Sequence, residues 1–284
     1  MPSDQAQEKS DLLSKLGAIV ERVPPAQITD PMHFVNRAKH LAMNHTLDPG
    51  KHGKGFFADQ FENEANWQAH FETTGPEIWT QCNGRIDAFV AGAGTGGTIA
   101  GVARFLKSQS PTVNVVLADP QGSGLFNRIK YGVMFSMTEK EGTRRRHQVD
   151  SVVEGIGMNR VTRNFEAGRE LIDDAVKVSD SEALEMAKWL VQKDGLFIGS
   201  SSAVNCRYLQ ALDGHLADII KGVAAVEYAR RCGPGNRIVT ILCDAGTRHL
   251  SKFWGGVEVV GLHAGASPGD LIMSSPQTKG NSSP

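Results

Sequence analysis

A glycine-rich loop is the most chemically suggestive stretch of the sequence. It reads GTGGT and consists of Gly94, Thr95, Gly96, Gly97 and Thr98, between an apolar strand pattern and a helical one. Glycines let a phosphate approach the backbone, threonines add hydroxyl donors, and the first amides of the following helix point at the same place. The GTGGT loop therefore predicts a phosphate site, with an ordinary strand-to-helix turn as the alternative. Its spacing matches neither Gly-x-Gly-x-x-Gly nor a P-loop, which argues against dinucleotides and nucleoside triphosphates.

Two further polar stretches follow apolar strand patterns. Asp244 lies in ILCDAG, residues 241–246, where a strand of a parallel sheet would end. Ligands bind at that edge of such sheets, so Asp244 is either a cofactor residue or the cap of the next helix. The second stretch, FIGSSSAV, is predicted to be a strand followed by a turn, and its three serines either bind an anion or simply form that turn.

The remaining reactive side chains show no known catalytic or metal pattern. The cysteines are Cys82, Cys206, Cys232 and Cys243. Their spacings contain no CxxC, which indicates reduced thiols in an intracellular compartment. The histidines show no metal-ligand spacing. We therefore predict no metal.

The overall composition excludes several classes of protein. The 284 residues are 40% hydrophobic and 21% charged, with a net charge of −1, which is typical of a soluble globular protein and gives no field for nucleic acid or an anionic membrane. A short basic run, TRRRH at residues 143–147, is predicted to be a solvated loop. No apolar run reaches the length of a membrane span, and the polar beginning of the sequence favours neither a secretory signal nor a transit peptide.

Apolar strand patterns alternate with helical ones along most of the chain. Helices are predicted at residues 4–16, 30–43, 67–82, 99–107 and 180–193, and strands at 18–23, 56–61, 88–94, 113–120 and 237–246. Ser3 or Asp4 would cap the first helix, and Pro31 would lie in the first turn of the second. This alternation predicts an α/β fold in which helices cover both faces of a parallel sheet.

Several stretches together resemble the cysteine synthase family, most closely its fungal-type branch. They are TTGPEIW, GAGTGGTIAGVARFLK, VVEGIGMNRV, GLFIGSSSAVN and ILCDAGTRHLSKFW, in this order between residues 73 and 254. The family consists of pyridoxal-phosphate enzymes of the tryptophan-synthase-β-like fold, related to cystathionine β-synthase. The resemblance implies a remnant of the small N-terminal domain at residues 1–65 and a large cofactor-binding domain at 66–254. The composition of residues 255–284, with many glycines, serines and prolines, predicts a disordered tail.

The resemblance also implies roles for particular residues. The GTGGT loop would hold the phosphate of pyridoxal 5'-phosphate, Asp244 would lie near the cofactor, and Gln60 would lie near the substrate carboxylate. The implied reaction is β-replacement, in which O-acetylserine or a related activated serine reacts with sulfide to give cysteine. Expected partners are a small amino-acid substrate and a second copy in a homodimer, and the expected compartment is the cytoplasm or the mitochondrion.

Two departures from the family pattern predict that this chain is inactive as given. The family's Schiff-base lysine and its Ser/Thr-Gly-Asn-Thr-Gly loop belong upstream of the first residues, and no lysine between Lys9 and Lys54 lies in that motif. Ala245 occupies the position where the family has a hydroxyl or thiol that contacts the pyridine nitrogen, and the neighbouring Asp244 is the residue that could take its place. The alternatives are a non-catalytic fragment that binds a phosphate ligand or a partner subunit, and an incomplete gene model.

Residues 207–222, RYLQALDGHLADIIKG, interrupt a stretch that would otherwise continue as one helix. Leucine and isoleucine recur in this segment with helical periodicity, which favours a helical insertion. A retained intron is the other hypothesis.

Overall fold

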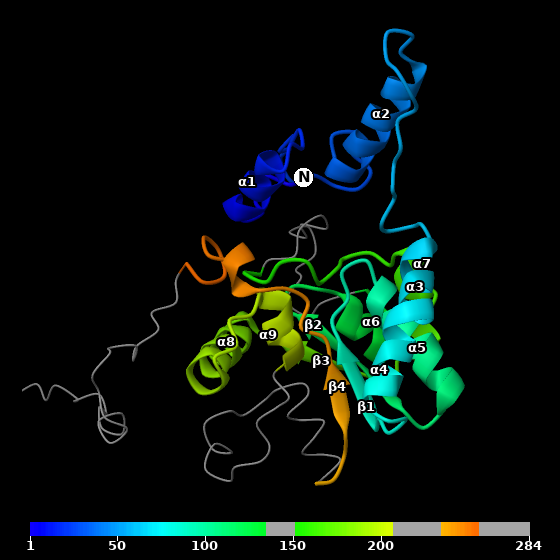
Figure 1. Ribbon diagram of the computed structural model, residues 1–284, viewed down its shortest axis with the longest axis vertical. Coiled ribbons are helices and arrows are strands. Elements are labelled where there is room, and N and C mark those ends of the chain that lie inside the picture. The colour runs from blue at the N-terminus through cyan, green and yellow to red at the C-terminus, as the bar shows by residue number, and fades with distance from the viewer. Residues whose placement is uncertain (135–150, 207–233, 256–284) are drawn as a thin grey trace, which may run out of the picture.

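The described residues contain a four-stranded parallel sheet at their core (Figure 1). The computed structural model describes residues 1–134, 151–206 and 234–255. The strands are β1 (Ala88–Ala91), β2 (Asn114–Pro120), β3 (Asp174–Val178) and β4 (Ile238–Thr240), in the spatial order β3-β2-β1-β4. Ala88 aligns with Asn114 on one side and with Ile238 on the other. The predicted parallel α/β fold is confirmed.

One face of the sheet packs against the helices that flank β1. Successive strand residues point to opposite faces, and Phe89 and Leu117 face a core shared with α4 (Gly75–Gln81) and α5 (Gly97–Gln109). The α4 helix is the end of a longer helical run that starts with α3 (Ala65–Ala69) and passes through a π-helical turn, η1 (His70–Thr74). The predicted helices at 67–82 and 99–107 therefore exist, and each begins two residues earlier than predicted.

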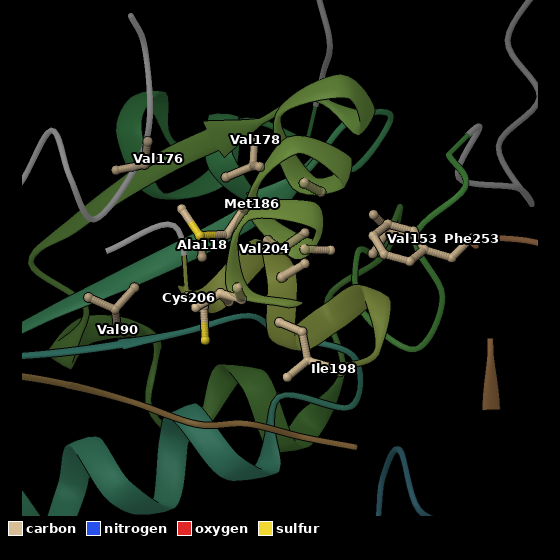
Figure 2. Packing of buried hydrophobic residues seen from close by; sticks show 14 of the residues in the cluster. Val90, Ala118, Val153, Val176, Val178, Met186, Ile198, Val204, Cys206 and Phe253 are labelled. Atoms are coloured by element: carbon tan, nitrogen blue, oxygen red, sulfur yellow. The ribbon is translucent and has the colours of Figure 1, made fainter. Parts of the chain in front are cut away.

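The opposite face packs against α8 (Asp180–Asp194) and α9 (Ser200–Cys206). Figure 2 shows Val90 and Ala118 of the sheet in the same cluster as Met186 and Val204 of these helices. Both α8 ends carry the expected signals, since Ser179 and Glu182 form a capping box and Gly195 closes the helix in the left-handed conformation. Helices thus cover both faces of the sheet (Figure 1).

Several predictions for the first 65 residues are wrong. The first helix, α1 (Gln7–Lys15), follows Ala6 and has no side-chain cap from Ser3 or Asp4. The second, α2 (Phe34–Leu47), begins after His33, whose ring accepts a hydrogen bond from the Val35 amide, so Pro31 precedes the helix. Residues 18–23 and 56–61 are not strands, and within them only Val23 makes a bridge, to Pro2. A strand is stable only when another strand completes its hydrogen bonds, and local sequence does not reveal that partner.

Other differences concern elements between the predicted ones. The serines of FIGSSSAV begin α9 rather than forming a turn, and Ile198 makes an isolated bridge with Ala245. β3 and two short helices, α6 (Leu125–Tyr131) and α7 (Arg163–Glu166), have no predicted counterpart. Two short 3-10 turns, η2 (Arg169–Leu171) and η3 (Gly246–Arg248), complete the described elements. The basic run at 143–147, the insertion at 207–222 and all but Gly255 of the predicted tail lie outside the described residues.

Within the described parts of the chain, no helix combines the length and the apolar character that a membrane span requires.

Candidate functional site

The sheet topology brings the GTGGT loop and Asp244 to the same edge. The chain leaves β1 through the GTGGT loop toward β2 on one side, and β4 lies on the other side of β1. The strand order therefore reverses between β1 and β4. Open parallel sheets bind ligands at such a switch point. The loop after β1 and residues 241–246 after β4 both begin there.

Asn205 joins the two segments that follow β1 and β4. Its Oδ1 accepts a hydrogen bond of 2.8 Å from the Gly92 amide, and its Nδ2 donates one of 3.0 Å to the Ile241 carbonyl. Asn205 is 1% exposed, so its carboxamide has no contact with solvent and these bonds satisfy its polar atoms. The asparagine thereby fixes the spacing between the segments that follow β1 and β4.

The glycines of the GTGGT loop are required by close packing. Gly96 has φ = +87° at the start of α5, and a Cβ there would lie 2.5 Å from Phe165. A Cβ on Gly94 would lie 2.1 Å from the Gly155 carbonyl oxygen. Because α5 begins at Gly97, the amides of its first turn have no acceptor within the helix, and among them the Gly97 amide donates to Thr95 Oγ1 at 3.3 Å. The loop is thus a tight turn, and the Thr98 and Ile99 amides that follow it have no acceptor within α5.

Both threonine hydroxyls of the loop contact the helical run formed by α3, η1 and α4. Thr95 Oγ1 accepts a hydrogen bond of 3.0 Å from Asn66 Nδ2, and Thr98 Oγ1 lies 3.1 Å from His70 Nε2. Burial lowers the pKa of His70, which favours its neutral ring. The Thr95 carbonyl accepts a 2.6 Å bond from the Thr162 hydroxyl. The hydroxyls are therefore held in place before any ligand binds.

The main chain of Gln60 lies beside the GTGGT loop. Its carbonyl oxygen accepts hydrogen bonds from Asn66 Nδ2 at 2.7 Å and from Asn164 Nδ2 at 3.1 Å. The same Asn66 nitrogen reaches Thr95, so one side chain bridges the Gln60 segment and the GTGGT loop. Gln60 as a whole is exposed. The structure thus brings the predicted substrate residue close to the predicted phosphate loop.

Asp244 is directed toward a buried histidine. His249 Nε2 lies 2.8 Å from Asp244 Oδ2, and His249 is 1% exposed. Burial acts to raise the pKa of Asp244, but the hydrogen bond and charge of His249, with smaller contributions from Lys9 and Arg248, outweigh it and lower that pKa. The alternative that Asp244 caps the next helix is wrong, because Ala245 is the residue before η3 and no side-chain cap is formed.

The serines of α9 are engaged with backbone groups. Ser200 Oγ accepts a hydrogen bond from the Glu154 amide at 3.0 Å, and Ser202 Oγ accepts one from the Cys243 amide at 2.8 Å. Both serines are fully buried. Their hydroxyls connect α9 to neighbouring segments, which gives them a structural role. In the described residues, no group of three or more histidine, cysteine or acidic side chains is arranged to hold a metal ion.

Replacing Asp244 by asparagine is expected to lower the free energy of unfolding near neutral pH by about 1–2 kcal/mol. Because folding lowers the pKa of Asp244, its charged form stabilises the protein above its unfolded value of 3.8, and this contribution disappears as the pH falls through the lower folded value. Urea unfolding of both proteins from about pH 7 to about pH 3 measures the effect. The gap between them should shrink at low pH, and a gap that does not change with pH would contradict the role of the carboxylate charge.

Comparison with known proteins identifies the family of the chain. The family model described as "Pyridoxal-phosphate dependent enzyme" matches residues 1–244. The chain belongs to this family. Membership in the pyridoxal-phosphate-dependent enzymes implies pyridoxal phosphate as the cofactor. A solved structure of an O-acetylserine-dependent cystathionine β-synthase from Helicobacter pylori shares the fold, with a TM-score of 0.65 and 30% identity over 89% of this chain and 68% of that one.

Fungal members of the pyridoxal-phosphate-dependent enzymes are more similar in sequence. Cysteine synthase 2 of Emericella nidulans is 62% identical over 270 residues, which cover 92% of this chain and 59% of the relative. Cysteine synthase 2 of Schizosaccharomyces pombe is 59% identical over 254 residues, covering 89% of this chain and 60% of the relative. The chain thus spans about three fifths of the length of these curated relatives.

Sequence reasoning missed the polar residues that support the site, namely Asn66, His70, Thr162, Asn164 and Asn205. Each acts through a hydrogen bond to a distant part of the chain, such as the 113 positions between Asn205 and Gly92. An isolated asparagine gives no sign of its partner in the sequence. The GTGGT loop was recognisable because its glycines and threonines are adjacent.

Proposed function

We propose that the GTGGT loop binds the phosphate of pyridoxal phosphate and that the chain is cysteine synthase-like. The associated reaction is β-replacement, in which O-acetylserine or a related activated serine and sulfide give cysteine. The observation that carries the proposal is the start of α5 at the switch point of the sheet, where the Thr98 and Ile99 amides have no acceptor within the helix and two threonine hydroxyls are held in place. A helix N-terminus of this kind stabilises a phosphate through its amides and its dipole.

Residues around the loop suit the rest of such a site. The Gln60 segment, which Asn66 and Asn164 hold beside the loop, would bind the carboxylate of the amino-acid substrate. Asp244 would lie near the cofactor, although its carboxylate already contacts His249. Pyridoxal phosphate, when bound, withdraws electrons from the α-carbon of an amino acid, which β-replacement requires. Ala245 is exposed and offers no side-chain hydrogen bond to the cofactor ring.

We expect these 284 residues by themselves to bind the cofactor without a covalent link and without catalysis. None of the lysines from Lys9 to Lys54 lies in the lysine motif of the family that the sequence resembles. A cofactor held only through its phosphate would be oriented, but no lysine amine would form the linkage or move a proton. A second candidate function is therefore a non-catalytic subunit that binds a phosphate ligand or a partner. Formation of a homodimer and a cytoplasmic or mitochondrial location stay predictions.

Binding of pyridoxal phosphate should be at least about 100-fold tighter than binding of pyridoxal, which lacks the phosphate, since two charge-assisted hydrogen bonds contribute about that much. Titration of the purified chain, followed by quenching of tryptophan fluorescence, measures both affinities. Equal affinities for the two ligands would contradict the phosphate site.

Borohydride reduction followed by mass spectrometry tests the second part of the proposal. We expect no stoichiometric lysine adduct and no formation of cysteine from O-acetylserine and sulfide. A specific adduct accompanied by cysteine formation would contradict the non-covalent state and support an active enzyme.

A further inference from the structure

Two side chains one helical turn apart face the hydroxyls of the GTGGT loop. Asn66 in α3 contacts Thr95, and His70 at the start of η1 contacts Thr98. Residues four positions apart lie on the same face of a helix, so this face presents polar groups to the loop. Either atom could be the donor in the contact of His70 with Thr98, whereas the direction of the Asn66 bond is fixed by its surroundings.

The Gln60 carbonyl fixes the orientation of the Asn66 carboxamide. A carbonyl oxygen only accepts hydrogen bonds, so the group that faces it at 2.7 Å must be the Asn66 nitrogen rather than its oxygen. The nitrogen carries two hydrogens, and the second is directed to Thr95 Oγ1 at 3.0 Å. Asn66 is therefore a donor to both the Gln60 segment and the GTGGT loop.

Thr95 Oγ1 accepts a second hydrogen bond from the Gly97 amide, at 3.3 Å. A hydroxyl oxygen has two acceptor positions and one hydrogen. With both acceptor positions filled by Asn66 and Gly97, the Thr95 hydroxyl can only donate in any further contact. A donor is the group that a phosphate oxygen requires, because an ionised phosphate oxygen only accepts.

We propose that Asn66 is a positioning residue that commits the Thr95 hydroxyl to donating toward a bound phosphate and ties the Gln60 segment to the GTGGT loop. The inference rests on the proposed phosphate site. The Asn66 carboxamide also lies directly against the start of α5, since a Cβ on Gly97 would lie 1.9 Å from Asn66 Oδ1. Asn66 thus sets both the distance and the hydrogen-bond polarity between α3 and the loop.

Asn66→Asp tests the polarity at nearly constant shape. An aspartate would accept the Thr95 hydrogen and place a negative charge beside the phosphate, so the affinity for pyridoxal phosphate should fall about 100-fold. The control is Gln68→Glu, which makes the same amide-to-carboxylate change at an exposed position of α3, and its affinity should stay within about twofold of the original. The free energy of unfolding of each variant, measured without ligand, separates loss of binding from loss of folding.

A double-mutant cycle with Asn66→Ala and Thr95→Val tests whether Asn66 acts through Thr95. Asn66→Ala alone should weaken pyridoxal phosphate binding about tenfold, and in the Thr95→Val background its effect should fall below about threefold. A purely structural role of Asn66 would give the same loss in both backgrounds. If Asn66→Asp does not fold, the double-mutant cycle still tests the proposed role of Asn66.

The outcomes distinguish the two proposals. If the unchanged chain binds pyridoxal phosphate no better than pyridoxal, the phosphate site and the role of Asn66 are both overturned. If that chain prefers the phosphate but Asn66→Ala binds equally well, or the two substitutions act independently, only the role of Asn66 is overturned. Loss of affinity in Asn66→Asp, a silent Gln68→Glu and strong coupling to Thr95 would establish it.

Discussion

Gly96→Ala is expected to lower the free energy of unfolding by about 3 kcal/mol. Gly96 has φ = +87°, a conformation that costs an alanine about 1 kcal/mol. The added Cβ would also lie 2.5 Å from the Cα and Cβ atoms of Phe165, which is 1% exposed and has no space to move into. Relief of this contact requires α7 and the start of α5 to separate, which adds about 2 kcal/mol.

The matched control is Gly195→Ala at the end of α8. Gly195 is also left-handed, with φ = +66°, but a Cβ there would have no atom within 4 Å. That variant should lose only about 1 kcal/mol, the cost of the backbone conformation alone. Chemical denaturation of both variants and of the unchanged chain measures the difference. Equal losses would mean that the contact with Phe165 contributes nothing.

The same substitution should affect the ligand. Movement of the start of α5 would displace the amides and the Thr95 and Thr98 hydroxyls that we propose to bind phosphate. A displacement of about 1 Å at a charged hydrogen-bonding site costs a large part of its binding energy. Gly96→Ala should therefore weaken pyridoxal phosphate binding more than about tenfold at temperatures where the variant is folded, and Gly195→Ala should leave the affinity unchanged.

The central strands could be predicted because their sequences are almost entirely apolar. β1 and β2 are buried on both faces, so AFVA and VVLA stand out against their neighbours. β3 reads DAVKV and lies at the edge of the sheet, and its Asp174 and Lys177 obscured the pattern. Residues 18–23 and 56–61 have strand-like composition, but a strand also needs a neighbouring strand, and that information is not local.

Only part of the candidate site could be predicted, for a similar reason. The GTGGT loop combines residue types whose joint presence is informative, and Asp244 was found from its place at the end of a predicted strand. The groups that orient the GTGGT loop lie far from it in the sequence. Asn66 is 29 positions before Thr95, and Thr162 is 67 positions after Thr95. Only the folded topology shows which asparagine faces the loop and which is an ordinary surface residue.

Glu154→Ala is expected to lower the free energy of unfolding by about 3 kcal/mol and to release α1 from the rest of the protein. The Glu154 side chain is 1% exposed and lies between α1 and residues 249–252. Its Oε1 accepts a 3.0 Å hydrogen bond from the Ala6 amide, and its Oε2 lies 2.6 Å from Lys9 Nζ. Lys252 Nζ and His249 Nδ1 are 3.4 Å and 3.7 Å away. Removal of this carboxylate would leave several donors and positive charges without their acceptor.

The expected loss in free energy of unfolding lies at the lower end of the range for a broken buried ion pair, because both lysine amines can be hydrated in the variant. Lys9 is 21% and Lys252 is 32% exposed at the side chain. The Ala6 amide is less able to do so, since Ala6 is 3% exposed. Glu154→Gln retains an oxygen that can accept from Ala6 but removes the charge, so it should lose about half as much as the alanine variant.

A second carboxylate connects α1 to the same region and serves as the control. Glu8 accepts hydrogen bonds from the amide and the hydroxyl of Ser251, the latter at 2.6 Å, but these contacts are exposed. Exposed interactions of this kind contribute less than about 1 kcal/mol, so Glu8→Ala should be nearly neutral. Both glutamates join the same two parts of the chain, and burial is the main difference between them.

Hydrogen exchange resolved along the chain distinguishes release of α1 from general destabilisation. In Glu154→Ala the amides of α1 (Gln7–Lys15) should exchange much faster, while those of β1 and β2 should change only as far as the global free energy of unfolding does. Leu12, Leu13 and Leu16 of α1 are already exposed, so this helix has few apolar contacts that could hold it once the carboxylate is gone. If Glu154→Ala were as mild as Glu8→Ala, or if α1 kept its protection, apolar contacts rather than the buried carboxylate would have to hold α1 in place.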